Sequence, residues 1–253
     1  MMFSAILNAT DLPVSQDEFR LRALAWADRH PLVAYYNPNG IPYPHEGFEH
    51  LLAVSSGKAL PLQEASAFHS LQAQLRSEHS LLCGFLTYDL KNQVEKLSSQ
   101  NHDGVCFPAI MFFEPDIYFH FKEEQVNIYS SADNIDDIVS RVLACKTPAA
   151  SSPAGVQVQQ RVSPKKYKAN VEHIRQHIEQ GNVYELNYCM EFFAEPVQIQ
   201  PLPLYLALNA ASPTPFSGYL KHEDRYLLCA SPERFLKKEG QKLISQPIKG
   251  TIR

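Results

Sequence analysis

Two side chains near the end of the sequence could act together in catalysis. Glu233 stands in the run Ser-Pro-Glu-Arg-Phe, and Lys249 follows it by 16 positions in the run Gln-Pro-Ile-Lys-Gly-Thr. A protonated carboxyl group can help a hydroxyl to leave, and a neutral amine can attack an electrophilic carbon. Either run alone is typical of a surface hairpin, so the inference depends on both occurring in order.

A β-hairpin is expected to carry the two runs. The apolar run Tyr226–Cys229 predicts one strand, and Phe235-Leu236 begins a second one. Glu239-Gly240 predicts the turn, and Lys242–Ser245 predicts the return strand. Pro247 cannot donate to a sheet ladder, so it marks the end of the return strand or an edge. The carboxylate and the amine would then lie on neighbouring strands.

Both runs, at this spacing, resemble those of the chorismate-binding enzymes, the family of anthranilate synthase and aminodeoxychorismate synthase component I. In anthranilate synthase the position of Lys249 is normally alanine. A lysine there is characteristic of the aminodeoxychorismate branch, which makes the precursor of 4-aminobenzoate for folate. The resemblance therefore favours an enzyme that converts chorismate and ammonia to 4-amino-4-deoxychorismate.

The resemblance also implies roles for individual residues. Lys249 would attack the chorismate ring at C2 as the nucleophile, and the C4 hydroxyl would leave with help from Glu233 as general acid/base. Ammonia would then add at C4 and expel the lysine. Gly250 and Thr251 would shape the ring pocket. A free lysine titrates near pH 10.4, so the site would have to lower the pKa of Lys249 for the amine to attack.

Cofactor and partner follow from the same resemblance. Mg²⁺ would counter the substrate carboxylates and favour the neutral amine. Its ligands are expected beyond Arg253, because family members extend substantially past this point. The 253 residues alone are therefore expected to hold no Mg²⁺ tightly and to turn over nothing. Nothing in the sequence suggests a serine or cysteine triad, so ammonia would come from a glutamine amidotransferase subunit or from solution.

Two side chains beside Glu233 are predicted to be structural. Ser231 is expected to support the turn at Pro232-Glu233, and Arg234 is expected to form a structural ion pair.

A capped helix and an alternating strand are expected ahead of these runs. Ser163 and Pro164 predict a helix start, and Gly181 predicts its end. Residues 184–192 alternate between apolar and polar types, which predicts a strand. Residues 178–187 and 212–220 resemble two further family segments. His173 and His177 are four positions apart, but no third ligand accompanies them, so we interpret them as residues of the helix surface.

The remaining sequence predicts an N-terminal lobe. Ser15 with Glu18 forms a capping-box pattern, Leu32–Tyr36 predicts a strand, and residues 110–121 predict another. A segment rich in proline and small residues, 146–160, predicts a linker. The predicted domains are an N-terminal lobe, 1–147, and the first part of a chorismate-binding catalytic domain, 160–253, truncated on its C-terminal side. The predicted fold class is α+β, anthranilate synthase component I-like, with large antiparallel sheets packed face to face and helices outside. Strands from both lobes are expected to share a sheet.

Composition excludes several classes of protein. The net charge of −4, without a basic run, gives no reason to expect nucleic-acid binding, and no apolar stretch is long enough to span a membrane. The five cysteines are scattered, which argues against a disulfide framework and favours a reducing cytoplasm. Each cysteine is interpreted as a small buried apolar residue.

Two alternatives stay open. One is an anthranilate- or isochorismate-forming relative, against which Lys249 argues. The other belongs to a different class, a non-catalytic lobe that docks a glutaminase or binds an amino acid.

Overall fold

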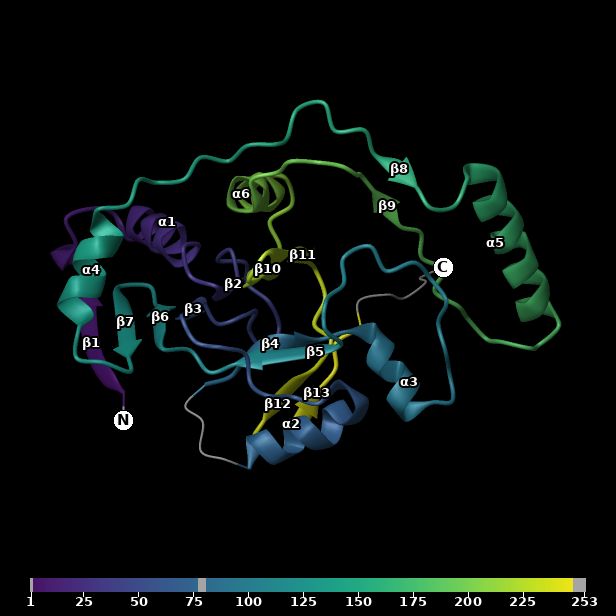
Figure 1. Cartoon of the computed structure of the whole chain (residues 1–253), viewed down its shortest axis with the longest axis horizontal. Coiled ribbons are helices and arrows are strands. Elements are labelled where there is room, and N and C mark those ends of the chain that lie inside the picture. The colour runs from purple at the N-terminus through teal and green to yellow at the C-terminus, as the bar shows by residue number, and fades with distance from the viewer. Residues whose placement is uncertain (1, 77–80, 248–253) are drawn as a thin grey trace. The chain divides into compact units, whose positions relative to one another are not determined.

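One antiparallel sheet of seven strands organises most of the chain (Figure 1). The computed structural model describes residues 2–76 and 81–247. The strands lie side by side in the order β1-β7-β6-β3-β2-β10-β11, and every neighbouring pair is antiparallel. Their bounds are β1 Phe3–Asn8, β2 Leu32–Asn37, β3 Leu51–Ser55, β6 Ile117–Phe121, β7 Gln125–Ser130, β10 Phe216–His222 and β11 Arg225–Ser231.

Three helices cover one face of this sheet, as Figure 1 shows: α1 Gln16–Ala27, α4 Ile135–Leu143 and α6 Pro201–Ala211. Alternate residues of a strand face opposite sides, and in β2 Val33 and Tyr35 lie in the core beneath the helices. Phe19 of α1 is fully buried there. Burying a side chain of this size contributes about 1.5–3 kcal/mol, so this face supplies much of the stability.

A two-stranded pair covers the opposite face. It consists of β4 Cys83–Leu86 and β5 Ile110–Phe113, and its Cys83 packs in one cluster with Leu32 and Ala34 of β2. The mixed α+β class with antiparallel sheets is confirmed. The single strand predicted over residues 110–121 is wrong, since it is two strands in different sheets, β5 and β6. Pro115 lies at the break, where it withholds a ladder donor.

Shorter elements connect these layers. They are η1 Ala9–Asp11, η2 Glu64–Ser66, α2 Ala67–Leu75, η3 Tyr88–Leu90 and α3 Lys91–Val94. None of the helices within residues 2–76 and 81–247 combines the length and the apolar composition that crossing a bilayer requires.

Local signals correctly predict the starts of α1 and α5. The Ser15 hydroxyl accepts from the Glu18 amide at 3.2 Å at the start of α1. The Glu18 carboxylate instead binds Arg22 at 2.6 Å, so only half of the predicted capping box forms. Ser163 caps α5 Pro164–Glu179 in the same way, by accepting from the Lys166 amide at 3.3 Å.

Strand pairing joins segments that are distant in the sequence. The described residues form two compact units, one built from the chain up to Ser151 and from Pro201 onward, the other from Ser152–Gln200. In the first unit, β10 pairs with β2 in the register Tyr219↔Tyr35. The expectation that strands of both lobes share a sheet is confirmed, and the predicted domain bounds, 1–147 and 160–253, stay a prediction.

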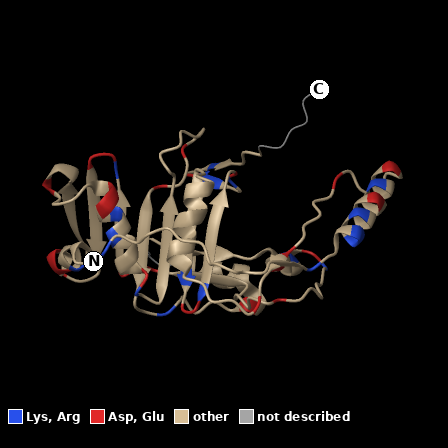
Figure 2. Cartoon of the chain, turned by 90° about the horizontal axis from the view of Figure 1, so that it is seen from above, with Lys and Arg blue, Asp and Glu red and all other residues tan. Residues whose placement is uncertain are grey.

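The second unit contains α5 and the short pair β8 Gln159–Gln160 and β9 Phe192–Phe193. Charged residues of both signs lie along α5 (Figure 2), and Arg175 pairs with Glu172 at 3.0 Å. The strand predicted over residues 184–192 is wrong. Only Phe192 belongs to a strand, and Tyr184 is 92% exposed. An alternating pattern forms a strand only when a neighbour completes its ladder, and no described strand pairs with residues 184–191.

The five cysteines are free thiols. Cys83 and Cys145 are buried and Cys229 is half-buried, whereas Cys106 and Cys189 are exposed. The prediction that every cysteine is buried is therefore wrong for Cys106 and Cys189, which lie in irregular segments away from the cores.

Candidate active site

Glu233 lies in a tight loop that leaves the edge strand of the large sheet. We call Ser231–Leu236 the Glu233 loop. The Ser231 hydroxyl donates to the Glu233 carbonyl at 3.1 Å and accepts from the Glu233 amide at 3.4 Å. A serine that binds the backbone two residues on stabilises a turn, which confirms the predicted supporting role of Ser231. Glu233 itself is half-buried.

The next side chain, Arg234, turns into the protein. It is 7% exposed, whereas its neighbour Phe235 is 93% exposed. The Arg234 guanidinium donates to the His45 carbonyl at 3.2 Å and also to the Glu46 carbonyl. The structural role predicted for Arg234 is thus supported, but its contacts are with main-chain carbonyls, where a carboxylate partner was expected.

These carbonyls belong to a loop of the N-terminal half, Tyr43–Phe48, which we call the anchor loop. Two more side chains that follow Glu233 reach the same loop. The Lys237 ammonium donates to the His45 carbonyl at 2.8 Å, and the Gln246 amide donates to the Pro44 carbonyl at 3.1 Å. Nothing in the sequence pattern marks the anchor loop as part of a site, because its contribution comes from main-chain groups.

The predicted turn and return strand form, but the strand before the turn begins at Lys237 and not at Phe235, so Glu233 lies in a loop ahead of the hairpin and not on a strand as predicted. The hairpin consists of β12 Lys237–Glu239 and β13 Lys242–Ile244, and Glu239 pairs with Lys242. Gly240 adopts a φ of +56° in the turn, a conformation that glycine adopts most readily. Lys249, Gly250 and Thr251 lie outside the described residues, so their approach to Glu233 stays a prediction.

A cavity of about 440 Å³ opens beside Glu233. Most of the Glu233 loop lines it, together with part of the anchor loop, Phe216 and Cys229. The volume is in the range of small-molecule sites, and apolar rings beside a few polar groups are typical of them. Burial raises the pKa of the Cys229 thiol, so this wall offers a protonated thiol and a poor nucleophile. Three acidic residues line the cavity, namely Glu46, Glu49 and Glu233.

Both cations in the lining are engaged in structural contacts. Arg234 binds carbonyls, and Lys237 pairs with Glu239 at 2.6 Å and with Glu46 at 3.6 Å. A dianionic substrate needs cations that are not already paired. The described lining thus supplies carboxyl groups but no unpaired cation to bind the carboxylates of such a substrate.

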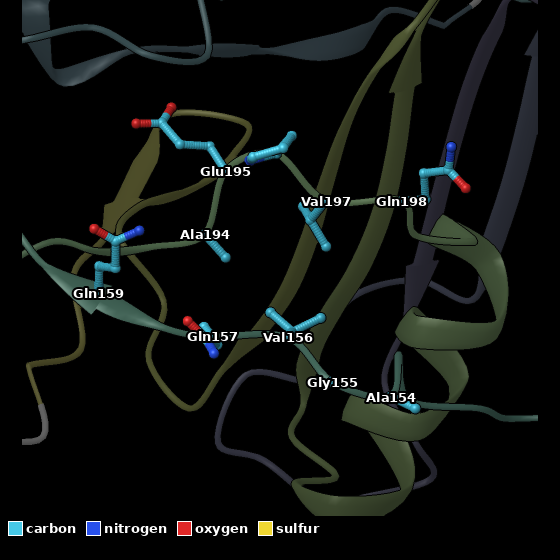
Figure 3. A pocket seen from close by; sticks show the side chains of 10 residues that line it. Ala154, Gly155, Val156, Gln157, Gln159, Ala194, Glu195, Val197 and Gln198 are labelled. Carbon is cyan, nitrogen blue, oxygen red and sulfur yellow. The ribbon is translucent and has the colours of Figure 1, made fainter.

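A second cavity, of about 460 Å³, lies within the Ser152–Gln200 unit (Figure 3). Val156 and Val197 face each other across it from two irregular segments, and Glu195 is the charged residue of its lining. Glu195 is also near the Arg161 guanidinium, at 3.8 Å. A single carboxylate does not suit an anionic substrate, so this cavity is the weaker candidate.

A third cavity, of about 450 Å³, lies at the start of α1. His50 lines it, with its Nε2 at 2.9 Å from the Tyr35 hydroxyl. Burial lowers the pKa of His50 to about 3, and Arg20 and His120 add to this effect. His50 is neutral at physiological pH and belongs to the packing of the helical face.

Among the described residues, no group of three or more His, Cys, Asp or Glu could hold a metal ion. The rings of His173 and His177 do approach each other, with their Nε2 atoms 3.2 Å apart. Both residues lie on α5, and His177 also contacts the Asn182 amide. They are helix-surface residues, as predicted, and the described chain by itself does not fit a Mg²⁺ site.

Comparison with known proteins agrees with this picture. Residues 33–253 match the family described as chorismate binding enzyme. Aminodeoxychorismate synthase component 1 of Bacillus subtilis is 24% identical over 81% of this chain and 49% of that protein. Anthranilate synthase component 1 of Thermus thermophilus is 24% identical over 66% of this chain and 38% of that protein. The chain thus spans half of the length of these relatives or less.

The fold agrees with a solved structure as well. The anthranilate synthase component I from Streptococcus pneumoniae TIGR4 aligns with a TM-score of 0.60 and 17% identity, over 95% of this chain and 52% of that one. This likeness confirms the anthranilate synthase component I-like fold. With the family match over residues 33–253, it follows that the chain belongs to the chorismate-binding enzyme family.

Proposed function

We propose that this protein is the chorismate-aminating component of an aminodeoxychorismate synthase. One observation carries the proposal: Lys249 follows Glu233 by 16 positions. In the family that these sequence runs resemble, a lysine at this position is characteristic of the aminodeoxychorismate branch. Support from the structure is the position of Glu233 on a cavity of about 440 Å³. The product would be 4-amino-4-deoxychorismate, which leads to 4-aminobenzoate and folate in the cytoplasm.

In the proposed reaction, the amine of Lys249 forms a bond to ring C2. The C4 hydroxyl leaves as water, with its proton supplied by Glu233. Ammonia then forms a bond to C4, and the bond between Lys249 and C2 breaks to regenerate the amine. The lysine would thereby occupy C2, the carbon that must not be aminated, and direct nitrogen to C4.

The proposal includes Mg²⁺ and a glutamine amidotransferase partner. Mg²⁺ would neutralise substrate carboxylates, and its ligands would lie outside the described residues. The partner would supply ammonia. The cations of the described lining, Arg234 and Lys237, are already paired.

The test is product analysis with the natural full-length protein, chorismate, Mg²⁺ and ammonium at mildly alkaline pH. We expect 4-amino-4-deoxychorismate by chromatography and mass, and its loss in Lys249→Ala. Lys238→Ala, on the exposed side of β12, is the matched control and should keep activity. Formation of anthranilate or isochorismate by the wild type would show that the branch assignment is wrong.

The second candidate is an anthranilate synthase component I. Its support is the 24% identity to the Thermus thermophilus enzyme over 66% of this chain. The same product analysis separates the two, because ammonia adds at C2 in that reaction and aromatic anthranilate results.

A further inference from the structure

The Glu233 loop and the hairpin segment after it are bound to the anchor loop by hydrogen bonds that converge on three successive carbonyls, those of Pro44, His45 and Glu46. The donors come from a short stretch after Glu233: Arg234, Lys237 and Gln246. Of these three side chains only Arg234 is fully buried. Because an Arg guanidinium stays charged and presents its donors in a fixed fork, it fixes geometry better than a flexible amine.

Aromatic rings enclose the Arg234 guanidinium. Its carbon atom lies 5.2 Å from the centre of the Phe216 ring and 5.8 Å from that of Tyr43. The two rings contact each other edge to face at 5.0 Å. A cation over aromatic faces, away from water, is held more strongly than one at the surface. Arg234 is thus the fixed point of the Glu233 loop.

The anchor loop is itself held in an unusual conformation. His45 and Glu46 have φ values of +58° and +63°, in the left-handed region that non-glycine residues rarely occupy. The Phe48 amide donates to the Pro215 carbonyl at 3.1 Å. A Cβ added at Gly47 would lie 2.8 Å from that same carbonyl oxygen, so only glycine lets the two backbones approach.

We infer that Arg234 is a positioning residue: the anchor loop holds the Arg234 side chain, and Arg234 in turn fixes the position of the neighbouring Glu233 carboxyl group. The inference rests on the proposed function, because it assigns Arg234 to the proton transfer through Glu233. The N-terminal half of the chain thereby sets the geometry of a group that lies in the C-terminal run. A shift of the anchor loop would therefore move Glu233 even when the sequence of the Glu233 loop is unchanged.

Two substitutions test the contact between Arg234 and the anchor loop, one on each side of it. Arg234→Ala removes the donors of Arg234, whereas Gly47→Ala should displace the anchor loop and keeps the arginine at position 234. Arg234→Lys restores one charged donor. Lys238→Ala, an exposed residue of the same hairpin, is the matched control.

The first readout is hydrogen–deuterium exchange of the Glu233 loop in the natural full-length protein. We expect faster exchange there in Arg234→Ala and in Gly47→Ala, less in Arg234→Lys, and no change in Lys238→Ala. This readout does not require turnover, so it decides the anchoring role even if the wild type forms no aminated product, an outcome that would overturn the proposed function alone.

The second readout is steady-state turnover of chorismate with ammonium. Misplacement of a catalytic group by about 1 Å can cost about 100-fold, so we expect kcat to fall about 10- to 100-fold in both Arg234→Ala and Gly47→Ala, with KM changed less than about 3-fold. Arg234→Lys should recover part of the loss. The double variant should be no slower than the slower single variant. Unchanged exchange in both single variants, or a loss confined to KM, would overturn the inference.

Discussion

The hydroxyl of Ser217 links α6 to β10, and its removal tests how the strand that leads toward the Glu233 loop is held. Ser217 is fully buried, with its Oγ 2.9 Å from the Tyr205 hydroxyl and donating to Asn209 Oδ1 at 2.6 Å. Ser217→Ala eliminates both hydrogen bonds. Asn209 Oδ1 keeps the Asn39 amide at 3.0 Å, and the Tyr205 hydroxyl keeps the Asn37 side chain. At about 0.5–1.5 kcal/mol for each bond, the expected loss is about 1–3 kcal/mol.

Urea unfolding provides the assay, because Trp26 is the single tryptophan and is buried on the inner side of α1. With a slope of about 2 kcal/mol per molar urea, a loss of about 2 kcal/mol lowers the midpoint by about 1 M. A double-mutant cycle with Tyr205→Phe should give a coupling energy of about 1 kcal/mol. Ser98→Ala, at an exposed serine, is the control and should leave the midpoint unchanged. Additive single effects, or an unchanged midpoint in Ser217→Ala, would refute the reasoning.

Two further predictions concern other parts of the fold. A Cβ at Gly84 would lie 2.0 Å from the Met111 carbonyl oxygen, whereas a Cβ at Gly218 would lie 3.5 Å from its nearest atom. Gly84→Ala should therefore lower the free energy of unfolding by more than about 2 kcal/mol, and Gly218→Ala should lower it by less than about 1 kcal/mol. Equal urea midpoints for the two variants would contradict this prediction. Because the pKa of His50 is lowered to about 3 in the folded state, the proton binds preferentially to the unfolded chain, and stability is full above about pH 6.5 and falls as the pH drops toward 3. Between pH 6.5 and 4.5 the free energy of unfolding should fall by about 2 kcal/mol more in the wild type than in His50→Gln, measured by urea titration at each pH. His69→Gln, at an exposed histidine, is the control. A fall as large in His50→Gln as in the wild type would refute the assignment.

Sequence signals that act locally determined much of the secondary structure. The caps at Ser15 and Ser163 mark the starts of α1 and α5, and the glycine turn at Gly240 marks the β12–β13 hairpin. Ser231 supports the Glu233 turn, as its position two residues before Glu233 suggests. Each of these features is determined by residues within a few positions of one another, so the pattern alone contains the information. The family followed in the same way from two short runs and their spacing.

Tertiary structure decided what depends on distant partners. The alternation of apolar and polar residues over 184–192 is typical of a strand. Residues 184–191 nevertheless form no strand, because no described strand pairs with them. Arg234 sits where an ion pair was expected, but its partners are carbonyls of the anchor loop, 189 positions earlier in the case of His45. Main-chain carbonyls are common to every residue, so no sequence pattern can mark them as acceptors. The sequence by itself predicted which groups could do the chemistry, and only the fold showed that Arg234, next to Glu233, binds the anchor loop.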